Sequence, residues 1–165
     1  MDKLKINQAG PDDIPIITKI KKAVWLDIYP NLGLGVTKKD ILALDFELEE
    51  SRRRQNMTKP NWRYWLARID NEPVGYLAAK KEDSQGIIKL VHVLSSYRGK
   101  GIGTALFNQA LEWLAGKRIR LQVVGNNSDA IEFYRKFGFS FMGRGRPIKI
   151  AGKKIDAIKM VVSNT

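Results

Sequence analysis

Apolar and polar positions repeat with two different periods along this chain, and each period predicts one type of element. Near the N-terminus, an alternating run predicts a first strand over residues 4–8. An apolar stripe with helical spacing over residues 14–24 then predicts a helix, which Pro30 ends. A second helix is predicted from Thr37, because threonine is a residue type that caps helix N-termini. Its apolar members are Ile41, Leu44, Phe46 and Leu48.

The rest of the chain predicts a sheet with further helices. Helices are expected over residues 102–116 and 127–137, and strands over residues 62–69, 73–79, 86–94, 119–124, from Phe139, and over 154–162. Strands and helices mix without strict alternation, which predicts an α+β fold with a mixed, mostly antiparallel central sheet flanked by helices. A length of 165 residues fits a single domain over residues 1–165.

Two local details of these strands are also predicted. Gly75 is expected to form a bulge within its strand. Side chains alternate between the two faces of a strand, so His92 is expected on the same face as Ile88 and Leu90. Lys89 and Val91 are then expected on the opposite face.

A glycine-rich junction joins the strand over residues 86–94 to the helix that follows it. Its sequence is Arg98-Gly99-Lys100-Gly101-Ile102-Gly103. The first amides of a helix lack intrahelical partners, and the helix dipole favours negative charge there. Glycines let the backbone turn tightly and approach a ligand closely. The junction therefore predicts a site for a phosphate or pyrophosphate, although it fits neither the P-loop nor the dinucleotide-binding pattern.

Two motifs give the chain a resemblance to a known family. The spacing Arg98-x-x-Gly101-x-Gly103 resembles the acetyl-CoA loop [QR]-x-x-G-x-[GA] of the GNAT superfamily of N-acetyltransferases. The residues before it resemble the V-x-P-x-Y-R of the family, with Ser95 in place of the frequent proline. The block from Asn127 to Phe139 resembles the second motif of the family, N-x-x-A-x-x-x-Y-x-k-x-G-F. The resemblance covers most of the chain from Trp62 onward.

The resemblance implies a GNAT-like fold, an acetyl-CoA-dependent N-acetyltransferase and acetyl-CoA as co-substrate. Tyr134 is expected to be catalytic, as the general acid whose hydroxyl protonates the CoA sulfur. Backbone amides around Val93 and Leu94 are expected to donate to the thioester oxygen. The full set of expected cofactor-binding residues is Val91, His92, Val93, Leu94, Arg98, Gly99, Lys100, Gly101, Ile102, Gly103, Thr104, Asn127, Ala130, Phe133 and Tyr134.

The acceptor is expected to be a primary amine of a small molecule or a protein. Because the first helices of the family shape the acceptor site, Trp25, Asp27 and Tyr29 are candidate substrate contacts, with core packing as the alternative. The second predicted helix is rich in acids, which could attract a cation such as a polyamine. The alternative is that these acids form helical ion pairs, from Glu49 to Arg53 and from Glu50 to Arg54. The acids are Asp40, Asp45, Glu47, Glu49 and Glu50.

The sequence favours direct transfer over a covalent intermediate, but it does not identify the general base. The chain has no cysteine, and a serine without a partnering base is a poor nucleophile. The positions at which family members often carry a base are here Lys89 and Ile87. His92 has the right chemistry but is expected on the wrong face of its strand. Glu82, Asp83 and a water chain remain open alternatives.

Composition adds partners and a location. The net charge of +12 favours anionic partners, although it could also have no functional partner. The turn Arg144-Gly145-Arg146-Pro147 spells the core of an AT-hook, so a nucleic-acid-binding protein is one rival interpretation. A non-catalytic CoA-binding module is another. The main expectation is an enzyme without a metal site and without a nucleic-acid partner. It is expected to be cytoplasmic and without a membrane partner, since no apolar run is long enough to span a bilayer and no secretory signal is evident. A homodimer is expected only from family habit.

Overall fold

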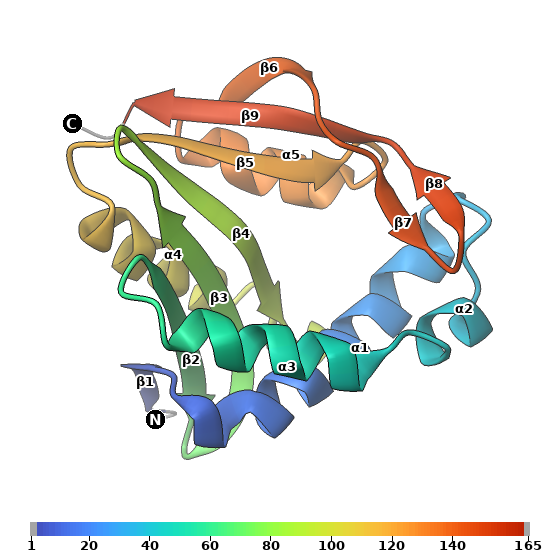
Figure 1. Cartoon of the computed structure of the whole chain (residues 1–165), viewed down its shortest axis with the longest axis horizontal. Helices are drawn as coiled ribbons and strands as arrows, with labels where there is room; N and C mark the ends of the chain where they lie inside the picture. The colour runs from blue at the N-terminus through green and yellow to red at the C-terminus, as the bar shows by residue number, and fades with distance from the viewer. Residues whose placement is uncertain (1–2, 164–165) are drawn as a thin grey trace.

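The computed structural model describes residues 3–163 and has a mixed sheet with helices on both faces (Figure 1). Within these residues the main sheet has seven strands in the order β1-β2-β3-β4-β5-β9-β6, and β7 and β8 form a separate hairpin. Neighbouring strands are antiparallel except for β4 and β5, which are parallel. The strands are β1 (Leu4–Gln8), β2 (Trp62–Ile69), β3 (Glu72–Lys81), β4 (Gln85–Val93), β5 (Arg118–Val124), β6 (Ser140–Arg144), β7 (Ile148–Ile150), β8 (Lys153–Ile155) and β9 (Ala157–Ser163). The predicted α+β class with a mostly antiparallel sheet is confirmed.

The helices pack against this sheet on both sides. The α-helices are α1 (Ile14–Ile28), α2 (Lys38–Leu42), α3 (Phe46–Met57), α4 (Ile102–Trp113) and α5 (Ser128–Lys136). Short 3-10 helices are η1 (Pro11–Asp13), η2 (Tyr29–Asn31) and η3 (Ser95–Tyr97). The predicted second helix divides into α2 and α3, because Asp45 accepts a hydrogen bond from the Leu48 amide and starts a new helix. The predicted last strand likewise divides into β8 and β9.

Alternation along the strands builds two separate cores. One face of β2 and β3 presents Tyr64, Leu66, Tyr76 and Ala78 to α1. The other face carries Trp65, Leu77 and Ala79 in a larger core that α4 and α5 complete with Leu106, Phe107 and Tyr134. A third, smaller core joins the hairpin β7–β8 to α2 and the loop before it, through Val36, Ile41, Val124, Ile150 and Ile155.

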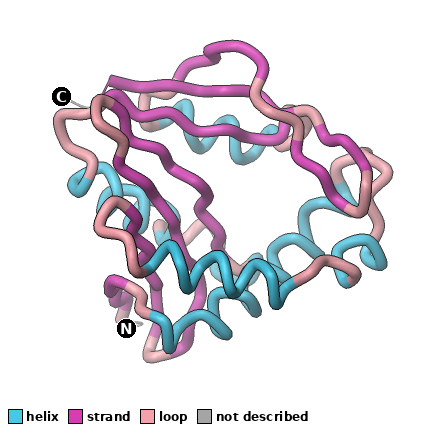
Figure 2. The backbone as a smooth tube through the Cα atoms, viewed as in Figure 1, coloured by secondary structure: helices cyan, strands magenta, loops and turns pink. Residues whose placement is uncertain are grey.

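The parallel strands β4 and β5 separate partway along their length. Their pairing runs from Gln85↔Arg118 to Ile88↔Leu121 and then stops, although β4 continues to Val93 and β5 to Val124. The two groups of strands therefore spread apart, as Figure 2 shows. The hairpin β7–β8 and the α1–α2 segment lie beyond the open end of this fork (Figure 1).

A β-bulge in β4 changes which side chains share a face. Ala78 pairs with Leu90 and Ala79 with Ile88, so Lys89 is an extra residue in β4. Ile88 faces the α4 core, whereas Leu90 packs against the α1 core. The expectation that Ile88 and Leu90 share one face was therefore wrong.

A second bulge lies in β3, one residue before Gly75, where a bulge was predicted. Ala67 pairs with Gly75 and Arg68 with Pro73, so the extra residue of β3 is Val74. Gly75 itself allows a close approach, because a Cβ there would lie 2.7 Å from the His92 carbonyl oxygen.

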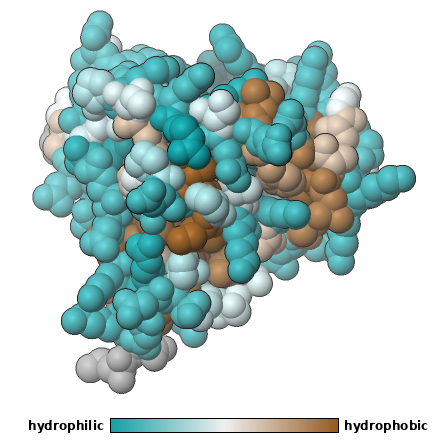
Figure 3. Space-filling view, turned by 60° about the horizontal axis from the view of Figure 1, so that its bottom comes forward, coloured by the Kyte–Doolittle hydropathy of each residue, from teal (hydrophilic) through white to brown (hydrophobic). Residues whose placement is uncertain are grey.

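The surface is mainly hydrophilic on the side shown in Figure 3, with smaller apolar areas between the polar side chains. The large apolar side chains that are exposed within residues 3–163 are Leu4, Leu42, Leu48, Phe141 and Met142. No helix in that part of the chain is both long and apolar enough to cross a membrane.

Candidate active site

A cleft of about 940 Å³ opens where β4 and β5 separate. Its floor is formed by residues 89–93 of β4 and residues 122–124 of β5. Segments from α1, η2 and the hairpin β7–β8 line one side, and the start of α4 and one face of α5 line the other. The cleft therefore connects the glycine-rich junction with the first helices.

The N-terminus of α4 has the features of an anion site. The Ala105 amide donates to the Gly101 carbonyl, which is the first α-helical hydrogen bond of α4. The first-turn amides before Ala105 therefore make no such bond within the helix. Gly101 is the N-cap with a φ of 82° and no side-chain cap, and the first turn carries no acid. Gly99 and Gly101 both face open space. These residues fit a phosphate or pyrophosphate, whose oxygens would accept from the first-turn amides.

Two of the three guanidinium nitrogens of Arg98 contact protein groups. Its Nη1 lies 2.9 Å from Asp27 Oδ2, and its Nε donates to the Val93 carbonyl oxygen at 3.0 Å. Lys100 lies over the ring of Tyr97, 5.3 Å from the centroid. Arg98 thus connects α1 to the end of β4, and the anion site depends mainly on backbone amides.

The end of β4 presents one amide to the fork. The Leu94 amide donates to the Val74 carbonyl at 2.9 Å, so it faces β3 and cannot donate to a thioester. This corrects the donor role expected for Leu94. Because N–H and C=O groups alternate in direction along an antiparallel strand, the Val93 amide faces the opposite way, toward the fork. The contact between the Val93 carbonyl and Arg98 is consistent with that direction.

Tyr134 lies at the α5 side of the cleft, with its ring in the core. Its neighbours are the rings of Phe107, Phe133 and Phe139. Burial raises the pKa of Tyr134, and the nearby Tyr29 phenol raises it further. Burial also raises the pKa of Tyr29 to about 12. Both phenols therefore keep their protons at neutral pH.

The fold brings most of the predicted site residues into the cleft. Trp25, Asp27 and Tyr29 line it, and so do all the expected cofactor residues except Leu94, Lys100 and Ile102. Ile102 is buried in the α4 core, so its side chain cannot reach a ligand. Asn127 lines the cleft and also caps α5, because its Oδ1 accepts from the Ala130 amide at 3.2 Å.

His92 lines the cleft but is a poor general base. Its Nδ1 lies 3.2 Å from the Tyr76 hydroxyl oxygen. Burial lowers the pKa of His92 to about 3, and the positive charges of Lys21, Arg53 and Arg98 contribute to this shift. The imidazole is therefore neutral and weakly basic. The other candidates, Glu82 and Asp83, line a separate surface depression at the β3–β4 turn.

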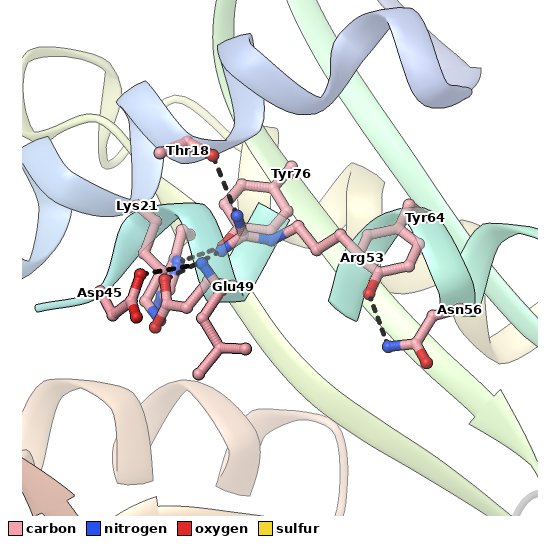
Figure 4. A network of polar contacts seen from close by, with 10 residues as sticks. Thr18, Lys21, Asp45, Glu49, Arg53, Asn56, Tyr64 and Tyr76 are labelled. Atoms are coloured by element: carbon pink, nitrogen blue, oxygen red, sulfur yellow. Dashed lines mark hydrogen bonds and ion pairs between the residues drawn. The ribbon is translucent and has the colours of Figure 1, made fainter. Parts of the chain in front are cut away.

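The acids of the first helices are mostly occupied by structural contacts. Glu49 accepts from Lys21 and lies 3.6 Å from Arg53 Nη2, while Arg53 Nη1 donates to Thr18 (Figure 4). Asp45 caps α3. Asp40 accepts from the amide of Thr37, the N-cap of α2, and from Lys153 at 2.7 Å. These hydrogen bonds, the one from Lys153 first, lower the pKa of Asp40 to about 2. The expected pair of Glu49 and Arg53 is confirmed.

Some cleft residues carry no sequence signal. Lys89, Gln122 and Ile148 line the cleft from three separate strands. Lys89 reaches it through the bulge in β4, which no turn residue marks. The strand β7, which carries Ile148, and its pairing with β8 were not predicted.

Known proteins resemble this chain in both sequence and structure. The sequence model of the acetyltransferase (GNAT) family matches residues 37–139. An uncharacterized N-acetyltransferase of Methanocaldococcus jannaschii is 32% identical over 134 residues, which cover 64% of this chain and 58% of that protein. The L-amino acid N-acetyltransferase of Escherichia coli is 31% identical over 114 residues, which cover 62% of this chain and 68% of that protein.

The crystal structure of an N-acetyltransferase from Thermoplasma acidophilum in complex with coenzyme A superposes with a TM-score of 0.76. The superposition covers 95% of this chain and 98% of that protein, and the two sequences are 16% identical. This likeness shows a shared fold. The family match covers well over half of the 165 residues. The chain therefore belongs to the GNAT family of acetyltransferases, as its two motifs predict.

Proposed function

We propose that this protein is an acetyl-CoA-dependent N-acetyltransferase that transfers the acetyl group directly to a primary amine of a small molecule or a protein. One observation carries the proposal. The uncapped N-terminus of α4, the Val93 amide and the Tyr134 ring all border the same cleft at the β4–β5 fork. Three requirements of the reaction, which are anion binding, carbonyl polarisation and proton donation, are thus met in one place.

Acetyl-CoA supplies a thioester whose carbonyl carbon is open to attack by an amine. The first-turn amides of α4 hold its pyrophosphate. The Val93 amide donates to the carbonyl oxygen, a contact that is worth about 2.7–4 kcal/mol when it strengthens in the transition state. The amine nitrogen bonds to the acetyl carbon as the C–S bond breaks, and Tyr134 passes its proton to the departing sulfur. The nitrogen then releases one proton to solvent, and Tyr134 recovers a proton from solvent, so that the products are the amide and the CoA thiol.

Direct transfer follows from the side chains that the cleft offers. The chain has no cysteine, and its one imidazole is bonded to Tyr76 rather than to a serine within the described residues. A covalent acetyl-enzyme would need an activated nucleophile, which this cleft lacks among residues 3–163.

A small-molecule acceptor has the best support. The Escherichia coli relative, which is 31% identical over 114 residues, is an L-amino acid N-acetyltransferase. The acids that favoured a polyamine are held by Lys21, Lys153 and helix caps, which leaves Glu47 and Glu50. A cationic acceptor therefore has little left to bind in this segment.

The nucleic-acid alternative has weaker support. In the turn over residues 144–147, the Gly145 amide donates to the Ala157 carbonyl at 2.8 Å, and the Arg146 amide donates to Gln122. The turn is bonded to the sheet, whereas a minor-groove hook requires a segment that can extend into the groove. The presence of Tyr134 likewise argues against a non-catalytic module.

Calorimetric titration with acetyl-CoA tests the proposal, with two matched glycine variants. Gly101 and Gly116 have φ values of 82° and 80° and both face open space, so an aspartate costs similar backbone strain at each. Only Gly101→Asp places a carboxylate beside the expected phosphates. We expect a Kd of about micromolar for the wild type and Gly116→Asp. Gly101→Asp should show no measurable binding. Absence of binding to the wild type, or equal binding by both variants, would overturn the proposal.

A further inference from the structure

We propose that the amine acceptor carries an anionic group, a carboxylate or a phosphate, and that Lys89 binds this group at the β4–β5 fork. The inference rests on the proposed N-acetyltransferase function and adds the chemical class of its acceptor. It is carried by the position of Lys89, by the positive charges around it and by the occupied state of the nearby acids.

The bulge in β4 places Lys89 on the acceptor side of the sheet. Leu90 pairs with Ala78 and Ile88 pairs with Ala79, so Lys89 is the extra residue between them. Lys89 and Leu90 both direct their side chains to the α1 face. Lys89 Nζ lies 5.8 Å from the centroid of the Trp62 ring, which belongs to that face. Lys89 also lines the cleft, one residue beyond the last rung of the β4–β5 pairing.

Positive charge surrounds Lys89 without a matching carboxylate. Lys80, Arg120 and Arg146 are close enough that their charges, together with burial as the largest cause, lower the pKa of Lys89. Glu82 acts in the opposite direction, but it forms ion pairs with Lys80 at 3.6 Å and Arg120 at 3.4 Å. Lys89 itself forms no ion pair within residues 3–163.

An anionic ligand would relieve this imbalance. An ammonium among other cations is destabilised by their repulsion, and a carboxylate or phosphate beside it restores favourable charge contacts. Arg146 lies beside Gln122, because its amide donates to the Gln122 side chain, and Gln122 lines the cleft. The fork therefore offers the ammonium of Lys89 on β4 and the amide side chain of Gln122 on β5, and the charge of Arg146 acts on Lys89 from nearby.

The same charges would help to deprotonate the acceptor. Positive groups near a bound amine disfavour its protonated form and lower its pKa. Within the described residues no base is evident on the acceptor side of the cleft, since His92 is neutral and weakly basic and Asp27 is paired with Arg98. The other carboxylate that lines the cleft, Asp129, belongs to the first turn of α5. An anionic group thus anchors the acceptor while the cations around it favour the neutral amine that attacks.

Matched pairs of acceptors test the inference. L-alanine is compared with L-alaninamide, and O-phosphoethanolamine with ethanolamine, and spermidine serves as a cationic acceptor. The initial rate of CoA release gives kcat/KM, and calorimetry without acetyl-CoA gives the affinity for each amine. We expect the anionic member of at least one pair to be preferred by about tenfold or more in both measurements. The pair that shows the preference distinguishes a carboxylate from a phosphate.

Two lysine variants separate a specific contact from general charge. Lys80 Nζ and Lys89 Nζ both lie 5.8 Å from the Trp62 ring, but Lys80 pairs with Glu82 and does not line the cleft. Lys89→Gln should abolish the preference, so that the anionic and neutral members of a pair are used within about twofold of each other. Lys80→Gln should retain the preference. Lys89→Glu should shift the preference toward spermidine.

The outcomes distinguish this inference from the proposed function. Equal use of both members of each pair, a preference for neutral amines or spermidine, or the same effect in both lysine variants would overturn the inference. The acetyltransferase proposal would stand in those cases, provided that acetyl-CoA binds and CoA is released. If acetyl-CoA does not bind but Lys89 still selects anionic amines by calorimetry, the proposed function fails and the anion site remains.

Discussion

The two walls of the cleft are built in different ways. On the wall proposed for the cofactor, the groups proposed to act are the first-turn amides of α4, the Val93 amide of β4 and the hydroxyl of the buried Tyr134, and local segments determine their positions. On the wall proposed for the acceptor, the lining segments are held in place by charge contacts that lie outside the cleft. Lys153 of β8 binds Asp40 of α2, and Lys21 of α1 binds Glu49 of α3.

This difference explains how one fold can serve many acceptors. Backbone amides at a helix N-terminus bind phosphate through main-chain groups, so many side chains of the cofactor wall can vary as long as no acid stands beside these amides. The acceptor wall depends on side-chain charge and on a bulge, which single substitutions can alter. We therefore expect the largest losses of stability from substitutions behind the acceptor wall and the largest losses of kcat from substitutions on the cofactor wall.

The largest effect on stability is expected from Glu49→Ala. Lys21 and Arg53 are 8% and 7% exposed, and both lose their carboxylate partner in this variant. Removing one member of a buried ion pair leaves charge uncompensated and costs about 3–5 kcal/mol. The free energy of unfolding in urea at neutral pH measures this loss.

Glu47→Ala is the matched control, because Glu47 lies on the same helix but is exposed. Its effect should stay within about 0.5 kcal/mol. A loss below about 1 kcal/mol for Glu49→Ala would mean that Lys21 sheds its proton instead, since burial already lowers the pKa of Lys21. The acceptor wall would then not depend on this network.

The largest effect on chemistry is expected from Tyr134→Phe. Since burial raises the pKa of Tyr134, its hydroxyl is protonated and can donate throughout the neutral range. Loss of a positioned general acid lowers kcat by about 10²-fold or more. The affinity for acetyl-CoA should stay within about twofold, because the phosphates are held by α4. Steady-state rates and calorimetry provide these two values.

Tyr29→Phe sharpens the assignment. Tyr29 lies across the cleft at the end of α1, and its phenol is also protonated. This variant should change KM for the acceptor more than kcat. If Tyr29→Phe lowers kcat as much as Tyr134→Phe does, the proton donor belongs to the acceptor wall and the division between the two walls is wrong.

The cofactor wall could be predicted from sequence because its determinants are local. The spacing of Arg98, Gly101 and Gly103 marks the start of α4, and the block from Asn127 to Phe139 marks α5. Two details escaped this reasoning. The Leu94 amide is occupied by Val74, and the side chain of Arg98 is directed to Asp27, because both depend on partners far away in the sequence.

Prediction of the acceptor wall from sequence was limited by long-range contacts. The bulge at Lys89 arises from the pairing of β3 with β4 and reverses the faces that simple alternation gives. The acids of residues 40–50 resemble a cation site in sequence, but their partners Lys21 and Lys153 are distant along the chain. The hairpin β7–β8 combines short strands that give no clear periodic signal.

The smallest effects are expected at the contact between the two walls. The Arg98–Asp27 pair is 39% and 46% exposed, so solvent screens it and it contributes less than about 1 kcal/mol. Arg98→Met removes this pair and also the hydrogen bond that fixes the Val93 carbonyl, whereas Asp27→Asn removes only the charge pair.

We expect Arg98→Met to lower kcat by about threefold to tenfold, because Val93 loses one of the contacts that orient it. Asp27→Asn should lower kcat by less than about threefold, with an effect that disappears at high salt. Measuring kcat for both variants at low and high ionic strength separates the two contributions. If Asp27→Asn costs as much as Arg98→Met at both ionic strengths, then α1 rather than the carbonyl contact holds Arg98 in place. The acceptor helix and the end of β4 would then act as one unit, and a substitution on either wall would be felt on the other.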